Sequence, residues 1–118
     1  MKSSTLWILL IFVIQTAIIL TGFYMSGLIM VGWHESVHKE IFKEYNISSN
    51  ITINHWNLSG KTVPEENTTC PDDCLLAHNQ NEIIGYTANG IMQGLWIIWL
   101  VTDTSIWLML LLYEVLSQ

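Results

Sequence analysis

Arginine is missing from the 118-residue sequence, and four lysines stand against ten aspartates and glutamates, which gives a formal net charge of −6. Proteins that bind nucleic acid need a basic surface to neutralise the phosphates. The charge balance therefore excludes nucleic acid as a partner. At this length, residues 1–118 form at most one small domain.

Charged residues and histidines are also missing from two long stretches, residues 3–33 and residues 83–102. About 20 apolar residues are enough to cross the hydrocarbon core of a bilayer as a helix. Such stretches exclude an ordinary soluble domain. We predict a mainly α integral membrane protein with two transmembrane helices, in contact with membrane lipid.

The first stretch predicts a transmembrane helix over about residues 5–33. A cleaved signal peptide with Lys2 as its positive end is the alternative, but the apolar part is too long and no small-residue cleavage site follows it. Trp7 and Trp33 flank the stretch at positions suited to the two membrane interfaces.

The second apolar stretch is interrupted by Asp103. One interpretation is a membrane-crossing helix within residues 71–102, followed by a short interfacial helix over residues 103–118 that Asp103 or Thr104 caps. The other is a single helix over about residues 95–116 with Asp103 buried. Because a carboxylate at the bilayer centre costs several kcal/mol, the sequence favours the first interpretation.

The polar segment between the two stretches, residues 34–82, contains N-x-[ST] glycosylation acceptors. They are Asn46, Asn50, Asn57 and Asn67. Because all of them fall in this one segment, we predict that it is extracytoplasmic and that both termini are cytoplasmic, in a two-pass topology.

Cys70 and Cys74 lie four residues apart at the predicted start of the second helix, with Pro71 suited to the first helical position. An extracytoplasmic location permits a disulfide. A bridge within one helical turn is geometrically demanding, so two unrelated thiols are the alternative. A zinc site would need two further ligands.

Directly after the first apolar stretch, His34, Glu35 and His38 form an H-E-x-x-H motif. Residues four apart share a helix face, so the two imidazoles can hold one Zn²⁺ while the intervening glutamate reaches a metal-bound water. The surrounding periodicity predicts a helix over residues 34–46 that continues from the first transmembrane helix.

A third ligand is available on the second helix, where His78, Glu82 and Tyr86 are spaced four residues apart. In a two-pass topology His34 and Glu82 both lie just beyond the outer ends of their apolar stretches. Two antiparallel helices would therefore bring them to similar depth, with His38 and His78 each one turn further out. The expected metal ligands are His34, His38 and Glu82.

H-E-x-x-H followed by a later N-E step on another helix, here Asn81-Glu82, resembles the gluzincin group of zinc metallopeptidases, the thermolysin-like arrangement. The resemblance implies zinc held by His34, His38 and Glu82, with Glu35 as general base in peptide-bond hydrolysis. It covers about a tenth of the chain.

The sequence departs from the gluzincin pattern at Tyr86, where the group usually has an acidic residue that orients a ligand histidine. The edge strand that precedes the motif helix in gluzincins is also missing. Within the loop or hairpin region, residues 47–70, the polar stretches 50–56 and 61–63 could instead form a hairpin after the motif, with an edge for an extended substrate.

The expected mechanism uses zinc to lower the pKa of a bound water toward about 7. Glu35 takes the proton as the water attacks the scissile carbonyl of a peptide or protein substrate. Tyr86 and His78 are candidate donors to the oxyanion, and His78 is an alternative metal ligand. His55 is expected to be an ordinary loop histidine.

Two other classes of function fit the same residues. A small accessory membrane protein would pack the side of its helix lined by Gly85, Gly90 and Gly94 on a membrane partner or on a second copy of the chain. A metal- or haem-binding redox protein would use the histidines together with the cysteine pair.

Overall fold

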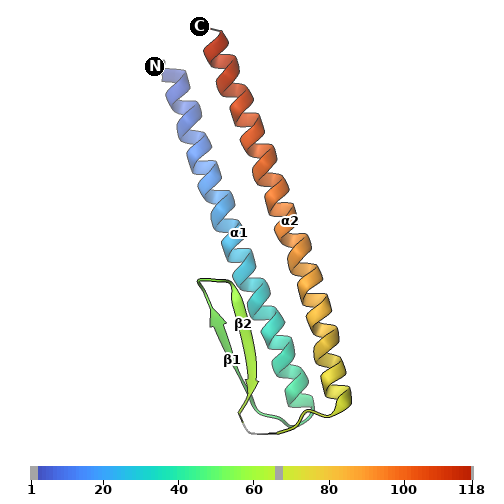
Figure 1. Ribbon diagram of the computed structural model, residues 1–118. Coiled ribbons are helices and arrows are strands. Elements are labelled where there is room, and N and C mark those ends of the chain that lie inside the picture. The colour runs from blue at the N-terminus through green and yellow to red at the C-terminus, as the bar shows by residue number, and fades with distance from the viewer. Residues whose placement is uncertain (1–2, 66–67, 118) are drawn as a thin grey trace. The chain divides into compact units, whose positions relative to one another are not determined.

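The computed structural model describes residues 3–65 and 68–117 (Figure 1). The elements in chain order are helix α1 (Ser3–Glu44), strands β1 (Ser49–Asn54) and β2 (Ser59–Pro64), and helix α2 (Asp72–Leu116). The prediction of a mainly helical chain with two long apolar helices and a small hairpin is confirmed. Two residues used above, Lys2 and the acceptor Asn67, lie outside the described residues.

Helix α1 carries the first apolar stretch and the H-E-x-x-H motif without a break, as predicted. It ends at Glu44, and Asn46 follows with a left-handed backbone, φ 57°. Asparagine tolerates this conformation better than most residues and so closes helices. The backbone N–H of Ile47 then donates to the carbonyl of Phe42 at 2.9 Å, which satisfies one free carbonyl of the last turn.

Strands β1 and β2 pair antiparallel, with Asn54 opposite Ser59 at the turn. Leu58 has a positive φ of 50°, and the side-chain oxygen of Asn54 accepts a hydrogen bond from the N–H of Trp56 at 3.0 Å. The turn therefore takes in Trp56, which the sequence pattern had placed in the first strand. Its ring is 98% exposed.

Helix α2 corrects the preferred interpretation of the second apolar stretch. It runs through Asp103 without a break, so no separate helix begins there. The Asp103 side chain is buried and accepts hydrogen bonds from Gln15 Nε2 at 2.7 Å and from Trp107 Nε1 at 3.2 Å. Because these bonds offset part of the cost of burying the carboxylate, Asp103 is held inside the helix instead of capping a new one.

The chain separates into two compact units. We call residues 25–91 the motif unit, and residues 3–24 with 92–117 the apolar unit. The motif unit holds the second half of α1, the hairpin and the first part of α2. Leu58 in the hairpin turn contacts the α1 backbone at Gly27, where an added Cβ would lie 2.9 Å from its Cδ1. The hairpin is thereby held alongside the motif helix.

The apolar unit is poor in buried side chains. Both α1 and α2 are long and apolar enough to cross a membrane, and only 6% of the most apolar window of each is buried. Ile19 is the one fully buried large side chain that the described residues of this unit contain. Almost all of its leucine, isoleucine and valine side chains therefore face outward.

Candidate metal centre

Two imidazoles of α1 face each other across one helical turn. The Nε2 atoms of His34 and His38 lie 3.1 Å apart, and the two rings meet edge to face. This follows from the helix itself, because side chains at i and i+4 lie one above the other on the same face. The motif spacing therefore predicts this part of the geometry correctly.

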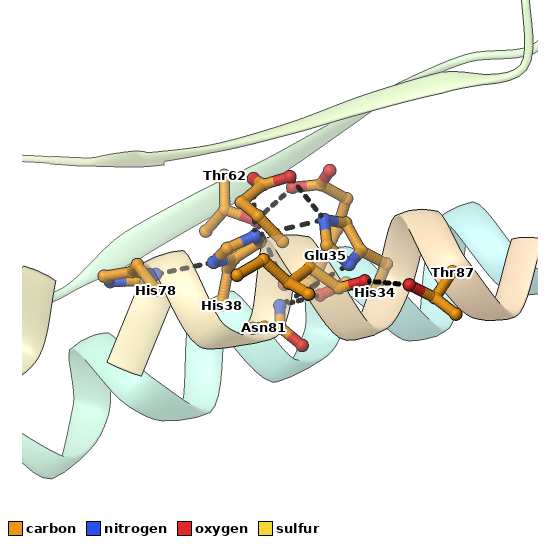
Figure 2. A network of polar contacts seen from close by, with 9 residues as sticks. His34, Glu35, His38, Thr62, His78, Asn81 and Thr87 are labelled. Carbon is orange, nitrogen blue, oxygen red and sulfur yellow. Dashed lines mark hydrogen bonds and ion pairs between the residues drawn. The ribbon is translucent and has the colours of Figure 1, made fainter. Parts of the chain in front are cut away.

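Glu82 of α2 completes the group. Its carboxylate oxygens lie 3.1 Å from His38 Nε2 and 3.5 Å from His34 Nε2. The three candidate ligand atoms all lie within 4.8 Å of one another, so these residues form a group that could hold a metal ion. Figure 2 shows the network around the two histidines, with side chains of the two helices pointing toward one another. The predicted meeting of His34, His38 and Glu82 is thus confirmed.

The α2 backbone comes very close to the His34 ring at Gly85. A Cβ at this position would overlap His34 Nδ1 and Cε1, so the glycine is needed for the approach. Asn81 is buried on the same side, and its amide nitrogen lies 3.5 Å from His34 Nδ1 and 3.4 Å from the His34 carbonyl oxygen. Gly85 and Asn81 together fix where the ring can lie.

His78 lies behind His38, on the side away from Glu82. Its Nδ1 is 2.5 Å from His38 Nδ1, and the two rings stack with centroids 4.8 Å apart. Burial lowers the pKa of the His78 side chain, and the neighbouring His38 lowers it further. His78 lies outside the apolar stretch that begins at residue 83. In this position His78 contacts His38, a predicted metal ligand, and it does not line the cavity beside Glu35 that is described below.

Glu35 is 5% exposed and is held by the hairpin. The hydroxyl of Thr62 lies 2.7 Å from its Oε2 and 3.0 Å from its carbonyl oxygen (Figure 2). A Cβ on Gly60 of β2 would overlap the Glu35 side chain. Sequence reasoning missed both hairpin contacts, although a glycine inside a strand is a known signal of close approach.

A cavity of about 190 Å³ opens beside these groups. Its wall includes His34, Glu35 and Glu82 from the helices and Gly60 from the hairpin, and Tyr86 also borders it. Tyr86 is 74% exposed, with its ring centroid 6.5 Å from that of His34. A carboxylate, two candidate metal ligands and a phenol therefore share one cavity, which is a suitable arrangement for acid–base chemistry.

The cysteine pair, which the sequence left open, forms a disulfide with Cα atoms 5.6 Å apart. Cys74 is fully buried. Its sulfur, that of Cys70 and a ring nitrogen of His78 lie within 4.8 Å of one another. His55 lies in the hairpin turn and belongs to neither of the two groups of described residues that could hold a metal ion.

No protein-family model, curated protein or solved structure matches the chain.

Proposed function

We propose that the chain is a membrane-bound zinc metallopeptidase in which His34, His38 and Glu82 hold the metal. The observation that carries the proposal is the close approach of three candidate ligands. The Nε2 atoms of His34 and His38 lie 3.1 Å apart, Glu82 Oε1 lies 3.1 Å from His38 Nε2, and Glu82 Oε2 lies 3.5 Å from His34 Nε2. A tetrahedral zinc with bonds of about 2.0–2.1 Å needs ligand atoms about 3.3 Å apart. Two imidazoles and a carboxylate leave the fourth position for water, as in catalytic zinc sites.

Glu35 is the proposed general base. When bound, zinc would supply an activated water and polarise a carbonyl oxygen. Glu35 would accept the proton of that water and return it to the leaving amine. Thr62 and Gly60 support this role because they hold the carboxylate in the cavity that His34 and Glu82 also line.

Tyr86 is the proposed donor to the developing oxyanion, because it borders the same cavity. His78, the other donor considered above, lies against His38 and outside this lining, so it supports His38 instead. Outer partners of this kind fix the orientation of a ligand histidine. In this proposal His78 orients the ligand His38, a role for which the gluzincin pattern uses an acidic residue.

The proposed location is a membrane, crossed twice, with residues 34–82 outside the cytoplasm. The exposure of nearly all apolar side chains in the apolar unit supports insertion, because a soluble core helix would bury them. The acceptors Asn46, Asn50 and Asn57 are exposed, as glycosylation requires, and the disulfide suits an oxidising compartment.

A cysteine placed at Trp56, in the exposed hairpin turn, tests this topology. A membrane-impermeant maleimide added outside the cell should label Trp56→Cys and should leave Ser117→Cys unlabelled until the membrane is opened. The native cysteines are bridged and do not compete. The reverse labelling pattern would invert the topology and remove the support from glycosylation.

The catalytic proposal is tested with Glu35→Gln, which keeps the shape of the side chain and removes the base. We expect zinc to stay at one per chain, while chelator-sensitive cleavage of a peptide library falls by about 10²–10⁴-fold. Ser36→Ala is the matched control, because Ser36 is exposed and its hydroxyl bonds to the Gly32 carbonyl of its own helix. Undiminished cleavage by Glu35→Gln would refute the mechanism.

A non-catalytic accessory role is the second candidate, and one observation favours it. Gly90 and Gly94 have open space where a side chain would stand, with nothing within 4 Å of an added Cβ. Gly85, the third glycine of the predicted packing side, is already covered by His34. Zinc-free protein that co-purifies with a membrane partner, and loses it on Gly94→Leu, would favour this role.

A further inference from the structure

A second set of side chains that could hold a metal ion lies at the start of α2, next to the proposed zinc centre. Cys70, Cys74 and His78 are spaced four residues apart, and their sulfurs and a ring nitrogen lie within 4.8 Å of one another. The disulfide at present uses both sulfurs. Among the described residues, His78 Nε2 is buried and has no hydrogen-bond partner.

We propose that reduction of the disulfide converts this cluster into a second metal site, with two thiolates and His78 as ligands for a thiophilic cation such as Zn²⁺. A dithiol reductant breaks the S–S bond and gives two thiols while it is itself oxidised to a disulfide. Each thiol then releases one proton as its thiolate binds the cation. Two cysteines and one histidine are an established zinc ligand set.

The nitrogen of His78 that remains for this metal is Nε2. Its Nδ1 is occupied by His38 Nδ1, 2.5 Å away, a distance at which one ring must donate a hydrogen and the other accept it. A neutral imidazole carries a single hydrogen, so a ring that binds metal through Nε2 must hold its hydrogen on Nδ1.

The two metal sites therefore exclude each other as long as the two rings stay in contact. When His38 binds metal through Nε2, its Nδ1–H donates to His78, and the hydrogen of His78 then occupies Nε2. When His78 binds metal, the direction reverses and the hydrogen of His38 occupies the nitrogen that faces Glu82. This exclusion rests on the proposed function, in which His38 is a zinc ligand, whereas the thiolate site does not.

The experiment separates the two sites with the double variant His34→Ala/Glu82→Gln, which removes the first centre but leaves the contact between His38 and His78. Cobalt(II) is the probe, because cobalt bound to thiolate gives a strong ultraviolet charge-transfer band. The full-length protein in detergent is loaded before and after reduction with a phosphine, without oxygen, and metal is counted by mass spectrometry. Circular dichroism checks that the helices persist.

The double variant should bind no cobalt when oxidised and one per chain, with the thiolate band, when reduced. Adding Cys74→Ser to it should abolish the band. A reduced double variant without the band would overturn the thiolate site. Reduced wild type should hold one metal per chain in total, and two metals per chain would overturn the exclusion. A failure of the proposed function would appear separately, as oxidised wild type that binds no metal.

Discussion

The motif unit and the apolar unit differ in how polar side chains are used. In the motif unit, the polar side chains of His34, His38 and Asn81 contact one another, and Thr62 of the hairpin holds Glu35 beside them. In the apolar unit the buried polar contacts centre on one carboxylate, Asp103. The first arrangement depends on particular atoms at particular distances, whereas most side chains of the second need only be apolar.

The largest expected effect is on the network of the motif unit, and it comes from His38→Ala. His38 contacts His34, Glu82 and His78, so its removal opens the centre of the network. Zinc content should fall from one per chain to near zero, and cleavage should be lost. His55→Ala is the matched control, because His55 lies in the exposed hairpin turn. If His55→Ala removes the metal and His38→Ala does not, the ligand set is wrong.

Much of the motif unit is predictable from sequence because its causes are local. The i, i+4 spacing fixes the relation between His34 and His38, and Asn46 with the serines that follow marks the end of α1. The approach of Glu82 to His34 follows from the positions of both residues just beyond the ends of the two apolar stretches. These features need only helix geometry and chain length, and the structure agrees with each of them.

The remaining features depend on contacts between residues far apart in the sequence. One of the hydrogen bonds that the buried Asp103 accepts within α2 comes from Gln15, 88 positions away. The spacing of His78, Glu82 and Tyr86 predicts that they share one helix face, but it does not predict on which side of His38 each residue lies. The hydrogen bond from Thr62 to Glu35 forms only when the hairpin folds back onto α1. A sequence pattern can indicate such residues as candidates, but it does not predict which of them contact each other.

Gly60→Ala tests whether the hairpin positions the base. The added Cβ would overlap the Glu35 side chain and displace it, and the three atoms nearest to it all belong to Glu35, not to the candidate ligands. Misplacement of a reacting group by about 1 Å can cost about 10²-fold in rate. We expect cleavage to fall by about 10–100-fold, with KM changed less than kcat and zinc still at one per chain.

Gly90→Ala is the matched control for Gly60→Ala, because its new methyl group would meet open space. It should keep full cleavage and full zinc content. Equal losses from the two substitutions would mean that the effect of Gly60→Ala is a general loss of stability. Loss of zinc in Gly60→Ala alone would show that the hairpin supports the ligands and not the base in particular.

The smallest expected effect lies in the apolar unit, where Asp103→Ala removes the acceptor that Gln15 and Trp107 share. A buried donor left without a partner costs about 1–3 kcal/mol. The variant should therefore unfold at lower denaturant concentration, as followed by helical circular dichroism in detergent. Asp103→Asn is the conservative comparison, because its amide oxygen can still accept both hydrogen bonds, and it should lose less stability.

Asp103→Ala also tests whether the two units act independently. The candidate ligands all belong to residues 25–91, and no described hydrogen bond of Asp103 reaches them. Mutations without shared partners usually have additive effects. Folded Asp103→Ala should therefore bind zinc with wild-type affinity. A loss of zinc affinity in the folded variant would contradict this independence and show that the buried carboxylate also serves the metal centre.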